Sequence, residues 1–166
     1  MSAGRLKLAD AAATEALGRA LGPLLRAGDV VALFGDLGAG KTSLARGALA
    51  ALGLAGEAPS PTFAIVQPYA PPELMLPVAH VDLYRLDEPG DAVELGLDDL
   101  LDDGALLVEW PERLDDALWP HALCLTLASD PGGGRRLTWS APAAWEGRWP
   151  PPPLPHPQPA LAPRPR

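Results

Sequence analysis

Eight consecutive residues in the first third of the chain match the phosphate-binding pattern G-x-x-x-x-G-K-[ST]. They are Gly35, Asp36, Leu37, Gly38, Ala39, Gly40, Lys41 and Thr42, and Ser43 follows them. Backbone N–H groups of such a loop, together with the positive end of the next helix, can surround the negative charge of a polyphosphate. In this pattern the lysine reaches the β- and γ-phosphates, and the Thr42 hydroxyl ligates Mg²⁺. These residues therefore predict a site for a nucleoside triphosphate and its magnesium ion.

Two further residues offer the acid that a magnesium–nucleotide site requires. Asp82 lies in the alternating segment 78–86, and Glu109 ends the apolar run that begins at residue 105. Magnesium keeps near-octahedral oxygen coordination, so one carboxylate is expected near Thr42, directly or through water. The residues alone do not decide between Asp82 and Glu109. His80 shares a strand face with Asp82, and we interpret it as structural.

The segments around the phosphate-binding pattern are the ones that such a loop needs. Residues 30–34 form a continuous apolar run, which is typical of a buried parallel strand. Residues 43–52 are mostly helix formers, with apolar residues at i, i+4 and i+8. The alternative is a chance glycine-rich turn between a strand and a helix, and the agreement of both flanks argues against it.

A second hydroxyl-bearing segment, Ser60-Pro61-Thr62-Phe63, follows the predicted helix. In many phosphate-loop proteins a mobile loop at this point senses the γ-phosphate and Mg²⁺ through a threonine. Thr62 is the candidate for that role here. An ordinary proline turn is the alternative reading of the same four residues.

The remaining segments predict an α/β fold of the three-layer P-loop type. We expect a mixed, mostly parallel sheet whose parallel strands include those ending at Phe34, Asp82 and Glu109, with antiparallel strands at an edge. The other expected elements are an edge strand at 5–8, a helix capped by Asp10 and shortened at Pro23, a strand at 63–66, a loop at 67–77, a helix at 91–101, a helix beginning at Pro111, and antiparallel strands at 122–128 and 135–140.

Length and composition limit the class of protein. A chain of 166 residues allows one domain, predicted at residues 1–149. The chain has neither an apolar run of about 20 residues nor a secretory h-region, so a cytoplasmic protein without a membrane segment is expected. The single cysteine, Cys124, lies in an apolar run and is interpreted as a buried structural thiol.

The C-terminal residues have a different composition from the predicted domain. In the segment 150–166, nine of seventeen residues are proline. Such a segment has little apolar surface to offset the entropy of ordering, so we predict an exposed, disordered, polyproline-type tail.

The net charge of −8 is unevenly distributed. Between Asp82 and Asp116 there are thirteen acids and two bases, Arg85 and Arg113. Direct nucleic-acid binding usually requires a basic surface, so this segment argues against it. Any macromolecular partner is expected to be a protein of complementary charge.

Five motifs in order identify a family resemblance. After the phosphate-binding loop come Ser60-Pro61-Thr62-Phe63, His80-Val81-Asp82-Leu83-Tyr84-Arg85-Leu86, Glu94-Leu95-Gly96-Leu97 and Glu109-Trp110-Pro111-Glu112. Over about residues 5–140 the chain resembles the TsaE (YjeE) family, the bacterial ATPases of tRNA threonylcarbamoyladenosine biosynthesis. The tyrosine-containing and tryptophan-containing motifs are more diagnostic than the phosphate-binding loop, which many families share.

The resemblance implies roles for particular residues. The nucleotide would be ATP and the metal Mg²⁺, held by Thr42 and Glu109. Lys41, Asp82 and Glu109 would be the catalytic residues. Thr62 would belong to a switch-like loop near the γ-phosphate, and Trp110 would lie close to the nucleotide.

The resemblance also implies partners. A TsaD–TsaB pair would transfer threonylcarbamoyl to the adenosine beside the anticodon of tRNAs that read ANN codons. This chain would hydrolyse ATP to reset or license that complex, and it would meet tRNA only through its partners. No general base or arginine finger stands out in the sequence, so slow hydrolysis by the isolated chain and stimulation by a partner are expected.

Two other functions fit a phosphate-binding loop. A small-molecule kinase fits the length and fold, but an arginine-rich lid is missing and Arg135-Arg136 is a thin substitute. A GTPase-like switch would need an [NT]-K-x-D motif, and the only lysines, Lys7 and Lys41, are not in such a setting.

Overall fold

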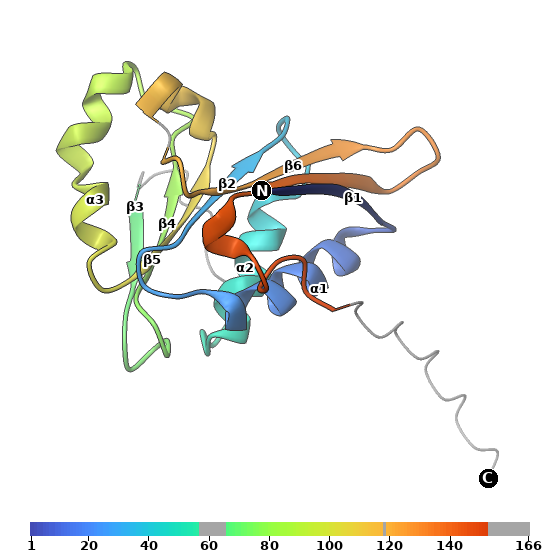
Figure 1. The fold of residues 1–166 in the computed structure, drawn as a ribbon, viewed down its shortest axis with the longest axis horizontal. Helices are drawn as coiled ribbons and strands as arrows, with labels where there is room; N and C mark the ends of the chain where they lie inside the picture. Colours follow the sequence, from blue (N-terminus) through green and yellow to red (C-terminus); the bar gives the residue numbers. More distant parts are fainter. Residues whose placement is uncertain (57–65, 118, 153–166) are drawn as a thin grey trace, which may run out of the picture.

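The computed structural model describes residues 1–56, 66–117 and 119–152, and its centre is a seven-stranded sheet (Figure 1). The order across the sheet is β1-β7-β6-β2-β5-β4-β3. The strands are β1 Ser2–Leu8, β2 Val30–Phe34, β3 Val66–Tyr69, β4 Val78–Asp82, β5 Ala105–Glu109, β6 Leu123–Ser129 and β7 Arg135–Ala141.

The four central strands, β6, β2, β5 and β4, run parallel to one another. Antiparallel pairing adds the outer strands: β7 pairs with β6 and β1 with β7 at one edge, and β3 pairs with β4 at the other. The predicted mixed sheet with antiparallel edge strands is therefore confirmed. Parallel strands place their carboxyl ends along one edge of the sheet, where ligands bind in open α/β folds.

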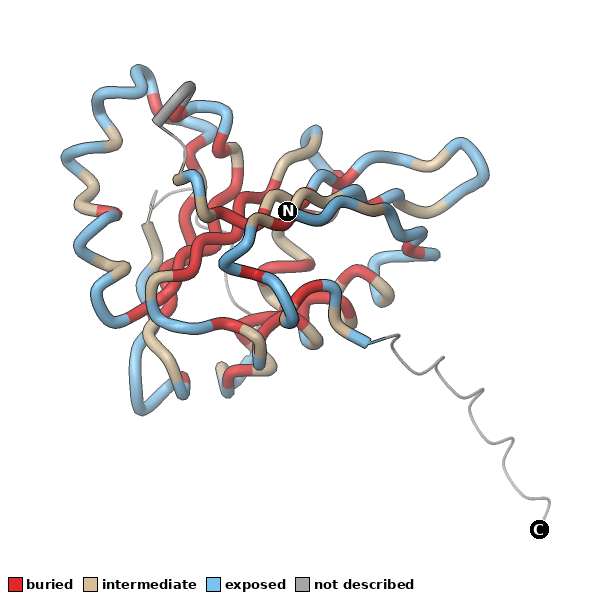
Figure 2. Tube along the Cα trace, in the orientation of Figure 1, coloured by how far each residue is buried: buried red, intermediate tan, exposed pale blue. Residues whose placement is uncertain are grey.

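Helical segments cover the two faces of the sheet. They are α1 Ala11–Leu21, η1 Gly22–Leu24, α2 Lys41–Ala51, η2 Pro89–Leu95, α3 Leu97–Leu100, η3 Pro111–Ala117 and η4 Ala143–Trp145. Alternate side chains of each central strand enter one of two apolar cores: Val31 and Leu107 face α1 and α2, whereas Val30 and Leu106 face α3 and η3. Buried residues accordingly concentrate along the central strands (Figure 2). This arrangement is the predicted three-layer architecture.

The helices α1 and α2 pack with unusually close backbones. A Cβ atom added to Gly18 of α1 would lie 2.1 Å from the Leu44 carbonyl oxygen of α2. A Cβ atom on Gly47 of α2 would lie 2.1 Å from the Glu15 carbonyl oxygen of α1. Asp10 caps α1 as predicted, because its side chain accepts a hydrogen bond of 2.8 Å from the Ala13 N–H.

Some predicted boundaries were wrong. The first strand begins at Ser2 instead of residue 5, because it pairs with the whole of β7. The third strand occupies Val66–Tyr69, which we had predicted mostly as a loop, since antiparallel pairing with β4 extends it. Pro68 is tolerated there because β3 is an edge strand. Of the strand predicted at 63–66, residues 63–65 lie outside the described residues.

Two further expectations needed correction. The helix predicted at 91–101 is divided into η2 and α3 at Gly96, whose φ of 64° is a left-handed conformation that interrupts helical hydrogen bonding. Cys124 is only half-buried, although burial still raises the pKa of its thiol. In the described part of the chain, no helix has the length and apolar character needed to cross a membrane.

The sheet is followed by a short segment that packs back onto the molecule. Trp145 of η4 is fully buried, and Trp149 is 5% exposed. The predicted domain boundary after residue 149 stays a prediction, since residues 153–166 of the predicted tail lie outside the described residues.

Candidate functional site

The phosphate-binding loop connects β2 to α2, as the pattern predicts. The strand ends at Phe34, and the helix begins at Lys41. Gly40 adopts a φ of 107° at the residue before the helix, a left-handed conformation that favours glycine. The Ala39 N–H closes the turn on the Asp36 carbonyl oxygen at 3.0 Å. The loop therefore presents the start of an eleven-residue helix to any anion bound there.

Lys41 is folded back onto its own loop. Its ammonium group donates a hydrogen bond to the Gly35 carbonyl oxygen and lies 3.6 Å from the centre of the Trp110 ring. The side chain is buried, and this desolvation lowers the pKa of Lys41 despite the opposing charges of Glu109 and other acids. The lysine is thus held by a carbonyl group and an aromatic face.

Trp110 has a strained backbone beside the loop. Its φ of 58° is left-handed, which is costly for a residue with a large side chain. The Trp110 ring also contacts Tyr84, with 4.9 Å between the ring centres. Trp110 therefore lies between Lys41 of the loop and Tyr84, which follows β4.

Glu109 joins the phosphate-binding loop to the neighbouring strands. The Thr42 hydroxyl donates hydrogen bonds to Glu109 Oε1 at 2.9 Å and Oε2 at 3.2 Å. On the other side, His80 Nε2 lies 2.6 Å from Glu109 Oε2, and both side chains are buried. A hydroxyl and a carboxylate that meet in this way are the oxygen ligands that Mg²⁺ prefers. Thr42 and Glu109 could therefore hold a magnesium ion together.

Asp82 stands beside Glu109 at the end of the next parallel strand. The two residues are paired across β4 and β5, and Asp82 Oδ1 accepts a hydrogen bond of 2.9 Å from the Tyr84 N–H. Burial raises the pKa of the Asp82 carboxyl, the Tyr84 N–H opposes this effect, and the charge of Glu109 adds to it. Two carboxylates at neighbouring strand ends would both be favoured in their charged form by a bound cation.

The predicted site residues occupy different parts of this arrangement. Lys41, Thr42, Glu109 and Trp110 are connected by direct contacts, and Asp82 is next to them. Asp36, Leu37 and Gly38 form the exposed outer part of the loop, and Ser43 is half-buried in the first turn of α2. The predicted switch residue Thr62 lies outside the described residues.

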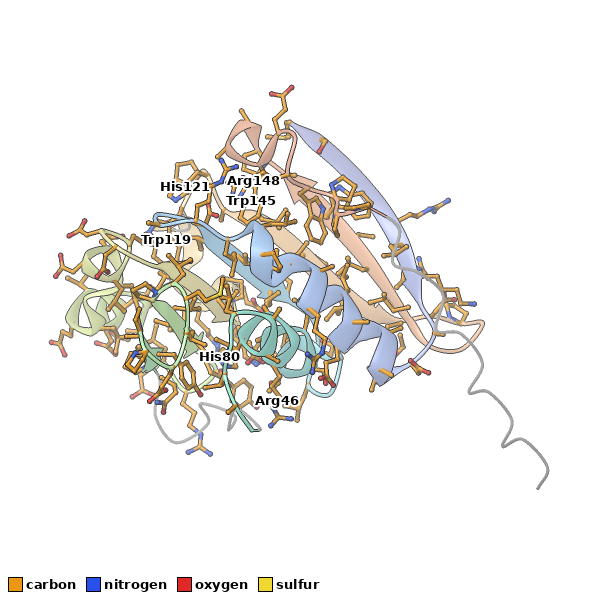
Figure 3. All side chains as sticks on the ribbon, turned by 90° about the horizontal axis from the view of Figure 1, so that it is seen from below. Arg46, His80, Trp119, His121, Trp145 and Arg148 are labelled. Atoms are coloured by element: carbon orange, nitrogen blue, oxygen red, sulfur yellow. The ribbon has the colours of Figure 1, made fainter. Side chains whose placement is uncertain are left out.

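Two contacts were missed by sequence reasoning. His80 was interpreted as structural, yet it contacts Glu109; its position two residues before Asp82 on an alternating strand was the available signal. Figure 3 shows His80 inside the molecule, apart from Trp145 and Arg148. Arg135 donates hydrogen bonds to the loop carbonyl groups of Ala39 and Gly38, a contact that its spacing in the sequence could not indicate.

Comparisons with known proteins agree with one another. A family model described as "Threonylcarbamoyl adenosine biosynthesis protein TsaE" matches residues 8–137. A Streptomyces coelicolor protein named "tRNA threonylcarbamoyladenosine biosynthesis protein TsaE" is 50% identical over 112 residues, which cover 67% of this chain and 76% of that protein. A Bacillus subtilis protein of the same name is 33% identical over 129 residues, covering 77% and 79% of the two chains.

Among solved structures, the fold is similar to the crystal structure of Bacillus subtilis YdiB. The TM-score is 0.71 with 28% sequence identity, and the superposition covers 84% of this chain and 86% of YdiB. Both the sequence and the fold of this chain are thus similar to known proteins over most of its length.

Proposed function

The chain belongs to the TsaE family, and we propose that it binds and hydrolyses ATP in the biosynthesis of threonylcarbamoyladenosine in tRNA. The observation that carries this proposal is the contact of Thr42, the last residue of a phosphate-binding loop, with the buried carboxylate of Glu109. Family membership favours this function over a small-molecule kinase or a GTPase-like switch.

In this proposal Thr42 and Glu109 hold Mg²⁺, which when bound neutralises charge on the β- and γ-phosphates. The donor set fits, because a hydroxyl and a carboxylate oxygen lie 2.9 Å apart at the start of the helix. Lys41 contributes a further positive charge once its ammonium group leaves the Gly35 carbonyl and the Trp110 ring. Water attack on the γ-phosphorus then forms one P–O bond and breaks the bond to the bridging oxygen, which leaves with ADP.

We further propose that the isolated chain hydrolyses ATP slowly. The Lys41 ammonium group contacts the Gly35 carbonyl oxygen and the Trp110 ring, and breaking these contacts costs free energy before the chemical step. Asp82 and Thr62 are the proposed additional groups near the γ-phosphate. A partner that stabilises the open arrangement of Lys41 and Trp110 would increase the rate.

The proposed partner is a TsaD–TsaB pair, which would carry out the transfer to tRNA. Eight exposed carboxylates and no basic residue lie between positions 86 and 104, on η2, α3 and their flanks. This charge supports contact with a protein of complementary charge and contact with tRNA only through that protein. We propose a cytoplasmic location, because a tRNA-modifying system needs access to tRNA.

ATP turnover tests the proposal, measured for the full chain alone and with a TsaD–TsaB pair. We expect little turnover alone, stimulation by the pair, and loss of turnover in Lys41→Ala and Glu109→Gln. Glu146→Gln is the matched control, because it makes the same substitution at an exposed carboxylate that is not among the proposed site residues. GTP in place of ATP tests the choice of nucleotide.

Rapid turnover by the isolated chain with no effect of the pair would contradict the partner-dependent mechanism. Unchanged turnover in Glu109→Gln would contradict the proposed metal site. Phosphate transfer to a small metabolite in place of water would favour the kinase alternative.

A further inference from the structure

Arg135, the first residue of β7, binds the phosphate-binding loop through its side chain. The guanidinium Nε donates a hydrogen bond to the Ala39 carbonyl oxygen, and Nη2 donates one to the Gly38 carbonyl oxygen, both at 3.0 Å. The partners are 96 and 97 residues apart in the sequence, so the fold alone brings them together. One planar side chain thus binds two consecutive carbonyl groups of the loop.

These carbonyl groups matter because the loop is proposed to bind an anion through its N–H groups. A loop that turns successive N–H groups toward an anion leaves its carbonyl groups on the outside. The outer part of this loop is exposed at Gly38, where water would otherwise compete for the carbonyl oxygen. A guanidinium group offers two charge-assisted donors in a fixed geometry, which a water molecule cannot do.

The position of Arg135 is itself well supported. Its backbone lies between two strands, in register with Leu8 of β1 and with Ser129 of β6. The turn before it is closed by a hydrogen bond of 3.1 Å from the Asp130 N–H to the Gly134 carbonyl oxygen. A side chain on such a paired strand can hold a loop in one conformation more firmly than a side chain on another loop.

We propose that Arg135 is a positioning residue that holds the phosphate-binding loop in its anion-binding conformation before the nucleotide arrives. The inference rests on the proposed function, because the bound anion is taken to be the triphosphate of ATP. A loop that is already ordered loses less conformational entropy on binding, so Arg135 increases affinity. It has no part in bond cleavage, so the rate at saturating ATP is independent of it.

The test compares Arg135→Gln, Arg135→Lys and the control Arg136→Gln in the full chain. Arg136 is exposed on the adjacent position of β7, so its side chain points to the other face of the sheet. We expect Arg135→Gln to weaken Mg–ATP binding about fivefold to tenfold, as for the loss of charge-assisted hydrogen bonds. Arg135→Lys keeps the charge and one donor, so its affinity should be intermediate, and Arg136→Gln should resemble the wild type.

Two readouts separate positioning from a general structural role. The first is kinetic: KM for ATP should rise in Arg135→Gln while kcat stays at the wild-type value. The second is amide hydrogen exchange of residues 35–41 in nucleotide-free protein, which should become faster in Arg135→Gln and stay unchanged in Arg136→Gln. Thermal unfolding of each variant shows that the comparison is made between folded proteins.

Equal affinities of Arg135→Gln and the wild type would overturn the inference, as would unchanged exchange of the loop. A loss of kcat as large as the rise in KM would also overturn it and assign Arg135 to the chemical step. If the wild-type chain did not bind Mg–ATP, the proposed function would fail, and the exchange measurement would still decide whether Arg135 holds the loop.

Discussion

At the scale of single residues, the His80 imidazole is one of the polar groups that contact the buried Glu109 carboxylate. The buried carboxylate accepts from the Thr42 hydroxyl at 2.9 Å and has His80 Nε2 at 2.6 Å. Removing the imidazole would leave an acidic side chain buried with one donor fewer, and such a loss at a charged group costs about 3 kcal/mol. We therefore expect His80→Ala to lower the free energy of unfolding by about that amount, measured by urea denaturation.

His80→Gln is the informative companion of this variant. Glutamine keeps an N–H donor on a side chain of similar reach, so it should recover part of the lost stability. The structure gives His80 Nδ1 no hydrogen-bond partner among the described residues, so the Glu109 contact is the polar interaction that the substitution removes. Wild-type stability of His80→Ala would show that Glu109 does not rely on this ring.

The residues of this site were predictable from the sequence to different degrees. The order G-x-x-x-x-G-K-[ST] determines its own local geometry, so the loop and the start of α2 could be predicted. The residue pattern alone could not choose between Asp82 and Glu109, because that choice depends on the register of β4 and β5; the family resemblance implied Glu109. In that register it is Glu109 that contacts Thr42, and Asp82 is its cross-strand neighbour.

At the scale of elements, the close contact of α1 and α2 determines the position of the helix that follows the loop. We expect Gly47→Ala to destabilise the protein although alanine favours helices, because its Cβ would lie 2.1 Å from the Glu15 carbonyl oxygen. Forcing extra volume into a packed contact costs about 1–3 kcal/mol, more than the helix propensity gained. Urea denaturation measures the change.

Gly90→Ala is the matched control for this variant. Gly90 belongs to η2, and an added Cβ would meet no atom within 4 Å, so this variant should be as stable as the wild type or slightly more stable. Because α2 begins at Lys41, the shift of α2 in Gly47→Ala should also weaken ATP binding. Equal stability of the two alanine variants would contradict the close packing of the helices.

The elements that were predicted correctly are those whose pattern is local. Asp10 at the start of α1 and Pro23 after its end carry their own signals, and both are where the sequence placed them. β3 could not be predicted from residues 66–69 themselves, since its pairing partner is β4. The break at Gly96 was also missed, because a glycine inside a helical pattern does not reveal its φ.

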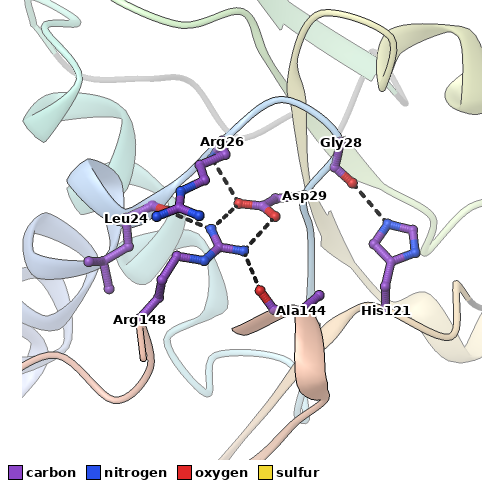
Figure 4. A network of polar contacts seen from close by, with 7 residues as sticks. All are labelled: Leu24, Arg26, Gly28, Asp29, His121, Ala144 and Arg148. Atoms are coloured by element: carbon purple, nitrogen blue, oxygen red, sulfur yellow. Dashed lines mark hydrogen bonds and ion pairs between the residues drawn. The ribbon is translucent and has the colours of Figure 1, made fainter. Parts of the chain in front are cut away.

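At the scale of the whole molecule, the segment after the sheet is bonded to the segment that leads from η1 into the central strand β2 (Figure 4). Arg148 donates hydrogen bonds to both carboxylate oxygens of Asp29, at 2.6 and 3.0 Å, and to the carbonyl oxygens of Leu24 and Ala144. Its guanidinium group also lies 4.3 Å from the Trp145 ring centre. The family match covers residues 8–137, so Arg148 lies beyond it, whereas Asp29 and Leu24 lie within it.

Two changes near the C-terminus are expected to differ in their effect on Tm. Arg148→Leu removes one partner of an ion pair whose side chains are each 9% exposed, and Asp29 is left buried with its charge. Breaking a buried pair in this way costs about 3 kcal/mol, which corresponds to a fall of about 10 °C in Tm for a domain of this size. Deleting residues 153–166, by contrast, removes a proline-rich segment with little apolar surface, so Tm should stay within about 1 °C of the wild type.

Differential scanning calorimetry of the two variants measures both effects, and Asp29→Asn extends the comparison. Asparagine can still accept the Arg26 N–H, which lies 2.7 Å from Asp29 Oδ2, so this variant should be less damaging than Arg148→Leu. Because the two partners interact directly, the double variant should be more stable than the sum of the single losses predicts. Additive losses in the double variant would mean that the pair contributes no coupling energy. A large fall in Tm on deleting residues 153–166 would place part of the folded domain beyond residue 152.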